Sequence, residues 1–207
     1  LDPVKVVVTN FPEDKVEYFE LPNNPNDENA GKRKVPFTRE LYIDRSDFEE
    51  VPPPKFFRMK PDGEVRLKYT YIIKCNEIVK DADGNVVELK CTYDPSTRPG
   101  SGEWRSVKGT IHWVSAAHAK EVELRLYDKL FTEPEMGSIP EGKDYKEYLN
   151  PDSLKVTSGF AEPALLEDNS GLAVQFERVG YFFKDLDSTP EHFVFNKTTA
   201  LKDSFKF

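Results

Sequence analysis

The chain has 207 residues, a net charge of −8, 38% hydrophobic residues and 13% aromatic residues. Disordered chains are poor in aromatic residues, so this composition predicts a folded protein of one or two domains. No apolar run approaches the ~18 residues of a membrane-spanning helix. No basic-then-apolar leader is visible, so we expect a cytoplasmic location. The first residue is Leu1, and we expect the chain to be part of a longer protein.

Short runs of β-branched and aromatic residues, bounded by Pro, Asn or Asp, predict strands along the whole chain. The runs are Val4–Thr9, Lys15–Leu21, Glu40–Arg45, Val65–Val79, Val86–Tyr93, Val107–Val114, Glu121–Phe131, Leu154–Phe160, Leu172–Phe183 and His192–Thr198. Helical turns are expected only at Ser115–Lys120 and Lys143–Leu149. About ten strands exceed what one small packed barrel holds, which favours two small barrels. We therefore predict an all-β chain with one barrel at 1–113 and a second at 114–207, whose C-terminal segment returns to the first.

The Asp83-Gly84 pair predicts a hairpin between the fourth and fifth runs, with a type I′ turn. Folding the chain about Ala82–Gly84 would place Cys75 directly opposite Cys91. Facing cysteines are able to form a disulfide, but two half-buried reduced thiols are the favoured interpretation, because no secretory signal is visible.

Catalytic motifs are missing from the sequence. His112, His118 and His192 have no metal-ligand spacing. Nucleophile-elbow, zinc-protease and phosphate-loop motifs do not occur. We therefore expect no catalytic residue, no metal site and no cofactor on this chain.

The most informative segment is basic and aromatic. It carries Lys55, Arg58, Lys60, Arg66, Lys68 and Lys74, with Phe56, Phe57, Tyr69 and Tyr71 among them and only Asp62 and Glu64 as acids. Arg66 and Lys68 are two apart on a predicted strand and should share a face. Such a face suits phosphates and base edges, and neighbouring aromatic rings suit stacking on unpaired bases. The alternative interpretation is a solvated strand face whose basic side chains cover apolar surface.

Longer motifs make the sequence recognisable. They are Asp2-Pro3-Val4-Lys5, Leu21-Pro22-Asn23-Asn24-Pro25-Asn26, Val35-Pro36-Phe37, Tyr42-Ile43-Asp44-Arg45-Ser46-Asp47-Phe48, Lys108-Gly109-Thr110-Ile111-His112-Trp113-Val114, Arg125-Leu126-Tyr127-Asp128-Lys129-Leu130-Phe131, Gly159-Phe160-Ala161-Glu162-Pro163, Gln175-Phe176-Glu177-Arg178-Val179-Gly180-Tyr181-Phe182 and Phe195-Asn196-Lys197-Thr198. In this order, over essentially the whole chain, they closely resemble the C-terminal anticodon-binding region of glutaminyl-tRNA synthetases.

The resemblance implies two β-barrels akin to ribosomal protein L25, which bind the anticodon loop of tRNA(Gln). It implies no membrane or DNA partner, and we expect a monomer. In the family the three anticodon bases are splayed out and read in separate pockets. In the family ATP and Mg belong to a catalytic, nucleotide-binding region that this chain lacks, so we expect no aminoacylation activity here. A family arginine that reads the middle base would lie just upstream of Asp2, so weak and less selective binding is expected of this chain alone.

The resemblance also implies roles for individual residues. Arg58 matches the arginine that recognises the third anticodon base, and Arg66 and Lys68 match the basic pair that serves the first base and its phosphate. Gln175 matches a glutamine that hydrogen-bonds the middle uracil between the barrels. The remaining matched positions are the polar contacts Arg178 and Asn26, and Lys55, which stands where an uncharged amide is common. Lys68 replaces an arginine that is typical of bacterial members, and so loses the bidentate fork.

Other functions stay open at this point. A glutamyl-tRNA synthetase of the eukaryotic or archaeal type shares the architecture, although Thr110–Val114 favours the glutamine family. A stand-alone L25-like module that binds ribosomal RNA would not need the second barrel. A carbohydrate-binding sandwich would need exposed aromatic residues without a basic strand.

Overall fold

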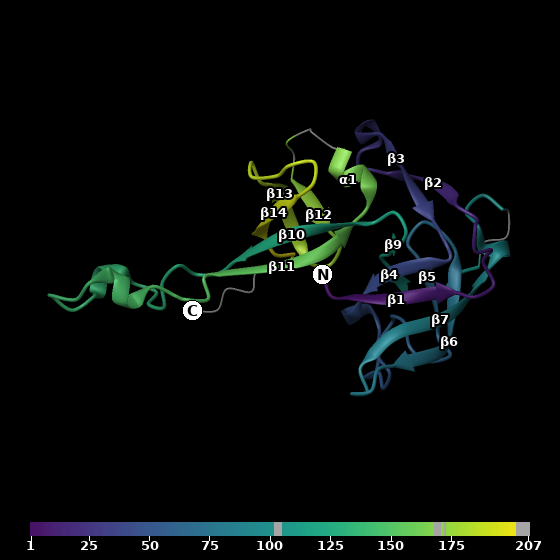
Figure 1. Cartoon of the computed structure of the whole chain (residues 1–207), viewed down its shortest axis with the longest axis horizontal. Coiled ribbons are helices and arrows are strands. Elements are labelled where there is room, and N and C mark those ends of the chain that lie inside the picture. Colours follow the sequence, from purple (N-terminus) through teal and green to yellow (C-terminus); the bar gives the residue numbers. More distant parts are fainter. Residues whose placement is uncertain (102–104, 168–170, 172, 202–207) are drawn as a thin grey trace. The chain divides into compact units, whose positions relative to one another are not determined.

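The computed structural model describes residues 1–101, 105–167, 171 and 173–201 (Figure 1). The chain divides by its contacts into two compact units. Unit 1 contains Leu1–Lys120 and Phe160–Glu167, and unit 2 contains Glu121–Gly159 and Asp168–Phe207. Nearly all regular structure in the described residues is β-strand, so the all-β prediction is confirmed. Among the described residues, no helix has the length and apolar character needed to cross a membrane.

Unit 1 is built on a seven-stranded sheet with the order β8-β5-β6-β7-β1-β4-β9 and a separate β2-β3 hairpin. Its elements are β1 (Pro3–Val8), β2 (Glu17–Pro22), η1 (Glu28–Ala30), β3 (Lys32–Phe37), β4 (Glu40–Asp44), η2 (Arg45–Asp47), β5 (Glu64–Leu67), β6 (Ile72–Lys80), β7 (Val86–Asp94), η3 (Pro95–Thr97), β8 (Thr110–Ile111), β9 (Val114–Ser115) and α1 (Pro163–Glu167). The two edge strands, β8 and β9, are separated in sequence only by His112 and Trp113. Because so short a link joins opposite edges, the sheet must curl until those edges meet, as in a barrel.

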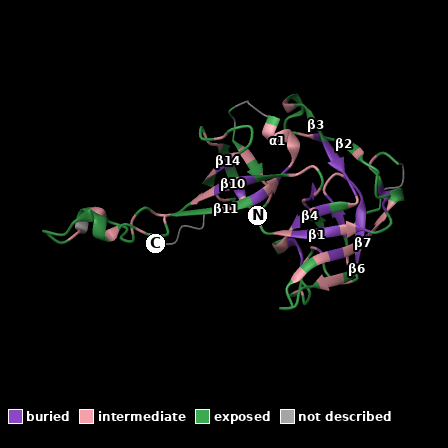
Figure 2. Ribbon diagram, in the orientation of Figure 1, coloured by how far each residue is buried: buried purple, intermediate pink, exposed green. Residues whose placement is uncertain are grey.

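Alternating burial along β1 shows how this strand contributes to the interior of unit 1. Val4, Val6 and Val8 on β1 are fully buried, whereas the residues between them are partly exposed. Successive side chains of a strand point to opposite faces, so this pattern places one face of β1 in the core. Figure 2 shows buried residues along β1, β3 and β7.

An aromatic cluster fills the space between this sheet and the β2-β3 hairpin. Phe37 is fully buried, and its ring centroid lies 5.0 Å from Phe11, 5.4 Å from Tyr71 and 5.2 Å from Trp113, always edge to face. Edge-to-face packing is a favoured arrangement of aromatic rings and adds to the free energy gained from burying them. The cluster therefore ties the hairpin to the barrel.

A partly buried hydrogen-bond network lies beside this cluster. The Glu17 carboxylate accepts hydrogen bonds from the Tyr71 hydroxyl at 2.9 Å and from Arg98 Nε at 2.6 Å. Burial opposes ionisation of Glu17, but the hydrogen bonds from Arg98 and Tyr71 outweigh it and lower the pKa of Glu17. Burial and the Glu17 carboxylate raise the pKa of Tyr71, so the phenol stays protonated.

This network predicts acid sensitivity. A lowered native pKa stabilises the fold above the unfolded pKa of about 4.3, and that stability is lost as pH falls through the native value. In urea titrations at several pH values, Glu17→Gln should therefore lose less stability below pH ~4 than the wild type. The control is the same substitution at Glu13, an exposed glutamate outside this network. Equal slopes for Glu17→Gln and the wild type would contradict the argument.

Unit 2 contains a five-stranded sheet with the order β11-β10-β14-β13-β12. Its elements are β10 (Lys120–Tyr127), η4 (Met136–Ser138), η5 (Tyr145–Tyr148), β11 (Leu154–Ala161), β12 (Val174–Phe176), β13 (Gly180–Lys184) and β14 (Val194–Thr199). Val122, Leu124, Phe182 and Phe195 form its buried side. Beyond β10 and β11 the chain extends as an arm that carries η4 and η5 (Figure 1) and is largely exposed (Figure 2).

Two predicted strands are in fact hairpins. The run Val65–Val79 is split into β5 and β6 by a turn at 68–71, and the described part of Leu172–Phe183 is split into β12 and β13 by a turn at 177–179. Tyr69 and Arg178, within these turns, adopt positive φ angles of 63° and 64°. This backbone conformation is uncommon for residues other than glycine, so the sequence carries no clear signal for either turn.

The predicted hairpin around Asp83-Gly84 is confirmed, but the type I′ turn is wrong. Only Gly84 has a positive φ there, and its amide donates to Asp81 at 3.1 Å. This is a longer loop built on a turn followed by a left-handed glycine. Cys75 pairs directly with Cys91 across β6 and β7, as predicted, and both are buried free thiols.

Candidate nucleic-acid interface

The turn between β5 and β6 forms one side of a pocket in unit 1. The Leu67 amide donates to the Tyr71 carbonyl at 2.9 Å, which closes the turn, and the Lys68 amide donates to the Ile111 carbonyl at 2.9 Å. The pocket has a volume of about 420 Å³. It is lined by Phe19, Glu20, Leu21, Arg66, Lys68, Tyr69, Pro99 and Thr110. Arg66 and Lys68 therefore share this pocket, although Lys68 lies in the turn and not on a strand.

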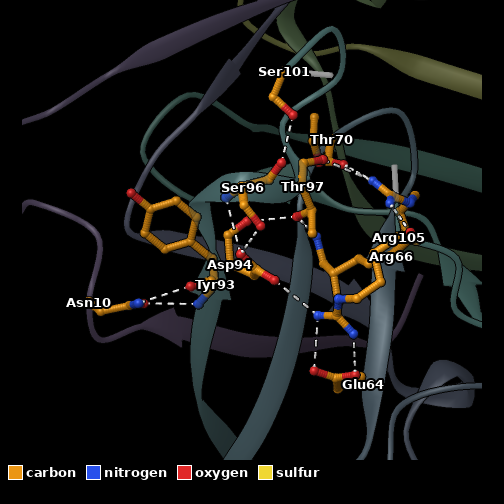
Figure 3. Close-up of polar contacts among 11 residues, drawn as sticks. Asn10, Glu64, Arg66, Thr70, Tyr93, Asp94, Ser96, Thr97, Ser101 and Arg105 are labelled. Carbon is orange, nitrogen blue, oxygen red and sulfur yellow. Dashed lines mark hydrogen bonds and ion pairs between the residues drawn. The ribbon is translucent and has the colours of Figure 1, made fainter. Parts of the chain in front are cut away.

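Arg66 reaches the pocket from inside the fold and is only 7% exposed. Its Nη1 donates to the carbonyls of Thr70 at 2.7 Å and Thr97 at 3.2 Å, and its Nη2 donates to the carbonyl of Arg105 at 2.8 Å. Figure 3 shows these bonds between the strands and the segment that follows β7. Burial, with a smaller contribution from the nearby Arg105, lowers the pKa of Arg66. Arg66 thus holds three backbone segments together behind the pocket.

A second arginine supports this arrangement. Arg105 donates to both carboxylate oxygens of Glu64, at 2.6 and 3.1 Å, and to Asp94 at 3.1 Å (Figure 3). The hydrogen bonds to Glu64 and then to Asp94 raise the pKa of Arg105. Bidentate arginine–carboxylate pairs have a defined geometry. The Arg105–Glu64 pair therefore fixes the position of Arg105, whose backbone carbonyl accepts the hydrogen bond from Arg66.

Lys68 supplies positive charge at the pocket itself. Its side chain is partly exposed, and Nζ lies 5.5 Å from the centroid of the Tyr69 ring. Its carbonyl accepts a hydrogen bond from the buried Trp113 at 3.2 Å. A cation beside an aromatic ring at the mouth of an apolar pocket suits a base with its phosphate.

Arg58 lies on a different segment of unit 1, next to the loop after β4. Its Nη1 donates to the Ser46 carbonyl at 2.7 Å, and its Nε lies 3.6 Å from the carboxylate of Asp47, which is 1% exposed. The Arg58 side chain is 38% exposed. Arg58 therefore partly neutralises a buried carboxylate while presenting an edge to solvent.

The other two predicted residues of unit 1 are exposed. Lys55 has a positive φ of 66° on the segment that leads to Arg58. Asn26 lies in the loop after β2, and its amide donates to the Asn24 side chain at 2.9 Å. Neither residue lines the pocket that contains Lys68.

Gln175 and Arg178 belong to unit 2. Gln175 is exposed on β12 and pairs with Tyr181 on β13, so the two side chains share one face of the sheet. Arg178 is exposed in the intervening turn with a φ of 64°. The hairpin closes through the Val179 amide, which donates to the Phe176 carbonyl at 3.0 Å.

Backbone strain is concentrated near these residues. The described non-glycine residues with positive φ are Lys55, Asp62, Tyr69 and Arg178. Lys55 and Arg178 are predicted site residues, and Tyr69 follows Lys68. Strained residues cost of order 1–3 kcal/mol each and cluster at ligand-binding sites.

The apolar walls of the pocket were not foreseen from the sequence. Phe19, Leu21 and Pro99 come from β2 and from the segment after η3, far in sequence from Lys68. Only the curling of the sheet and the packing of the hairpin bring them together. The described residues contain no cluster of three or more His, Cys, Asp or Glu side chains able to hold a metal ion.

A barrel whose basic residues border an apolar pocket is typical of β-proteins that bind unpaired nucleotides. Two family models with the same description, the anti-codon binding domain of class I (E and Q) tRNA synthetases, match residues 1–94 and 110–185. The chain belongs to this family of anticodon-binding domains.

Curated relatives agree with this assignment. The chain is 52% identical over 207 residues to the glutamine–tRNA ligase of Pseudomonas putida, with 99% of the chain and 36% of the relative covered. It is 50% identical over 206 residues to those of Rhodopirellula baltica and Nitrobacter hamburgensis, again over 99% of the chain, with 34% and 36% of the relatives covered. The chain thus spans about a third of the length of these relatives.

Proposed function

We propose that this chain is the anticodon-reading module of a glutamine–tRNA ligase and that its ligand is the anticodon loop of tRNA(Gln). The observation that carries the proposal is the pocket lined by Lys68, Arg66 and apolar walls in a chain of this family. The relatives at about 50% identity are named glutamine–tRNA ligases, which favours glutamine over glutamate. The parent enzyme would ligate glutamine to tRNA with ATP and Mg, bound by regions outside this chain, in the cytoplasm.

In this proposal the first anticodon base enters the pocket and its phosphate approaches Lys68. Arg66 positions the turn that carries Lys68, because its guanidinium binds the carbonyl of Thr70. Arg58 donates to the edge of the third base. Gln175, with its amide on the exposed face of β12, contacts the middle uracil, while Arg178, Asn26 and Lys55 supply further polar contacts to the loop.

Lys68 provides a test through the salt dependence of binding. The affinity of single-stranded nucleic acid falls with salt with a slope of about 0.7 per neutralised phosphate. For an anticodon hairpin titrated at several salt concentrations, Lys68→Gln should therefore reduce the slope by about 0.7. Lys90→Gln is the matched control and should leave the slope unchanged, because Lys90 lies on β7 and pairs with Glu77 of β6. An unchanged slope for Lys68→Gln would contradict the phosphate contact.

A further inference from the structure

Phe57 is an exposed aromatic residue in the basic segment that precedes β5. Its side chain is 51% exposed, and Lys108 Nζ lies 5.5 Å from the ring centroid. The segment at residues 51–60 contains Lys55, Arg58 and Lys60 and no acidic residue. A large apolar ring thus lies at the surface in a segment whose charged residues are all basic.

The backbone that carries Phe57 is held from three directions. The buried Met59 donates its amide to the Asp47 carbonyl at 2.9 Å and accepts from the Glu49 amide at 3.1 Å. Arg58, which lies between Phe57 and Met59 in sequence, donates to the carbonyl of Ser46. A Cβ on Gly109 would lie 2.6 Å from the Phe57 carbonyl oxygen, so the two chains approach as closely as glycine permits. The ring is therefore presented from a fixed position, which lowers the entropy cost of binding a ligand.

The Phe57 backbone lies next to a segment that leads directly into the pocket. Lys108 and Gly109 directly precede Thr110, which lines the pocket and begins the edge strand β8. Two residues of extended chain span at most about 7 Å. Phe57, which contacts Gly109, therefore lies along the same edge of unit 1 as the pocket and beside Arg58, so nucleotides of one anticodon loop would pass both.

We propose that Phe57 is a stacking platform for an unpaired RNA base, with Lys108 close enough to approach the phosphate of that nucleotide. The inference rests on the proposed function and extends it, since the base stacked on Phe57 would be the one whose edge Arg58 contacts. The positive charges of the segment favour RNA over an apolar protein partner. Stacking requires only a flat ring, so Phe57 supplies affinity at this nucleotide and Arg58 supplies the choice of base.

The test is the affinity of anticodon hairpins for the chain, measured by fluorescence anisotropy. Phe57→Ala and Phe57→Leu should each weaken binding about 5- to 150-fold, the equivalent of ~1–3 kcal/mol for one stacked base. Phe57→Tyr, which keeps a flat ring, should bind within about twofold of the wild type. Val51→Ala is the matched control, because Val51 is 83% exposed in the same segment but is not aromatic. Thermal melting should show that every variant folds, since Phe57 is a surface residue.

A hairpin that lacks the third anticodon base completes the experiment. The difference between the wild type and Phe57→Ala should vanish with this abasic RNA if that base stacks on Phe57. Wild-type affinity in Phe57→Leu, or an undiminished difference with abasic RNA, would overturn the inference. If the wild type itself binds all anticodon sequences equally, the proposed function fails and not the role of Phe57 alone.

Discussion

Arg66→Ala is expected to lower the free energy of unfolding of unit 1 by about 3 kcal/mol or more, because each buried carbonyl left without a donor costs ~1–3 kcal/mol. Three carbonyls, those of Thr70, Thr97 and Arg105, would lose the same guanidinium. Since a domain has a total stability of only about 5–15 kcal/mol, the loss should be evident in urea or thermal unfolding.

Two variants separate this effect from RNA binding. Arg66→Lys keeps one charged donor group but not the planar fork, so its stability should lie between those of the wild type and Arg66→Ala. Lys68→Ala removes the neighbouring positive charge and should leave stability within about 0.5 kcal/mol of the wild type. Wild-type stability in Arg66→Ala would contradict a structural role for Arg66 and leave it as an RNA contact alone.

Arg58→Ala should weaken binding of a glutamine anticodon hairpin by about 1–3 kcal/mol and relax the choice of base at the third anticodon position. The expected reason is the loss of guanidinium hydrogen bonds to the base edge. Binding should be measured with hairpins that carry each of the four bases at that position. Arg58→Lys keeps the positive charge but loses the planar guanidinium. It should therefore keep much of the affinity for the hairpin and lose more of the preference for one base at the third position.

The contact between Arg58 and Asp47 calls for a control in the same experiment. Because the Asp47 carboxylate is buried, Arg58→Ala will also cost some stability, and affinities must be compared below the melting temperature of the variant. An equal loss of affinity for all four hairpins would show that Arg58 contacts only the phosphate backbone.

The strand content and the central hairpin of this fold can be predicted from sequence because alternation and the Asp-Gly turn are local signals. The pairing of Cys75 with Cys91 follows from the same local register. The strand β3 was missed, since Lys32–Phe37 is largely basic and contains Pro36, which usually argues against a strand. Pro36 is tolerated because β3 belongs to a two-stranded sheet, where each strand has an open edge.

The site was only partly predictable for a related reason. Tyr69 and Arg178 reverse the chain in a conformation that propensity assigns to glycine or asparagine, so both turns were interpreted as continuous strands. The basic residues were identified from composition, but the burial of Arg66 depends on carbonyls from residues 70, 97 and 105, which only the closed sheet brings together.

The most direct test of the central claim is the affinity of the chain for an anticodon hairpin with the sequence CUG, compared with hairpins in which one base is changed so that the anticodon no longer belongs to glutamine. In the proposed function different residues contact the three bases, so each change should weaken binding by about 1–3 kcal/mol and the three losses should add approximately. Equal affinity for the CUG hairpin and all its single-base variants would contradict the claim that this chain reads the anticodon.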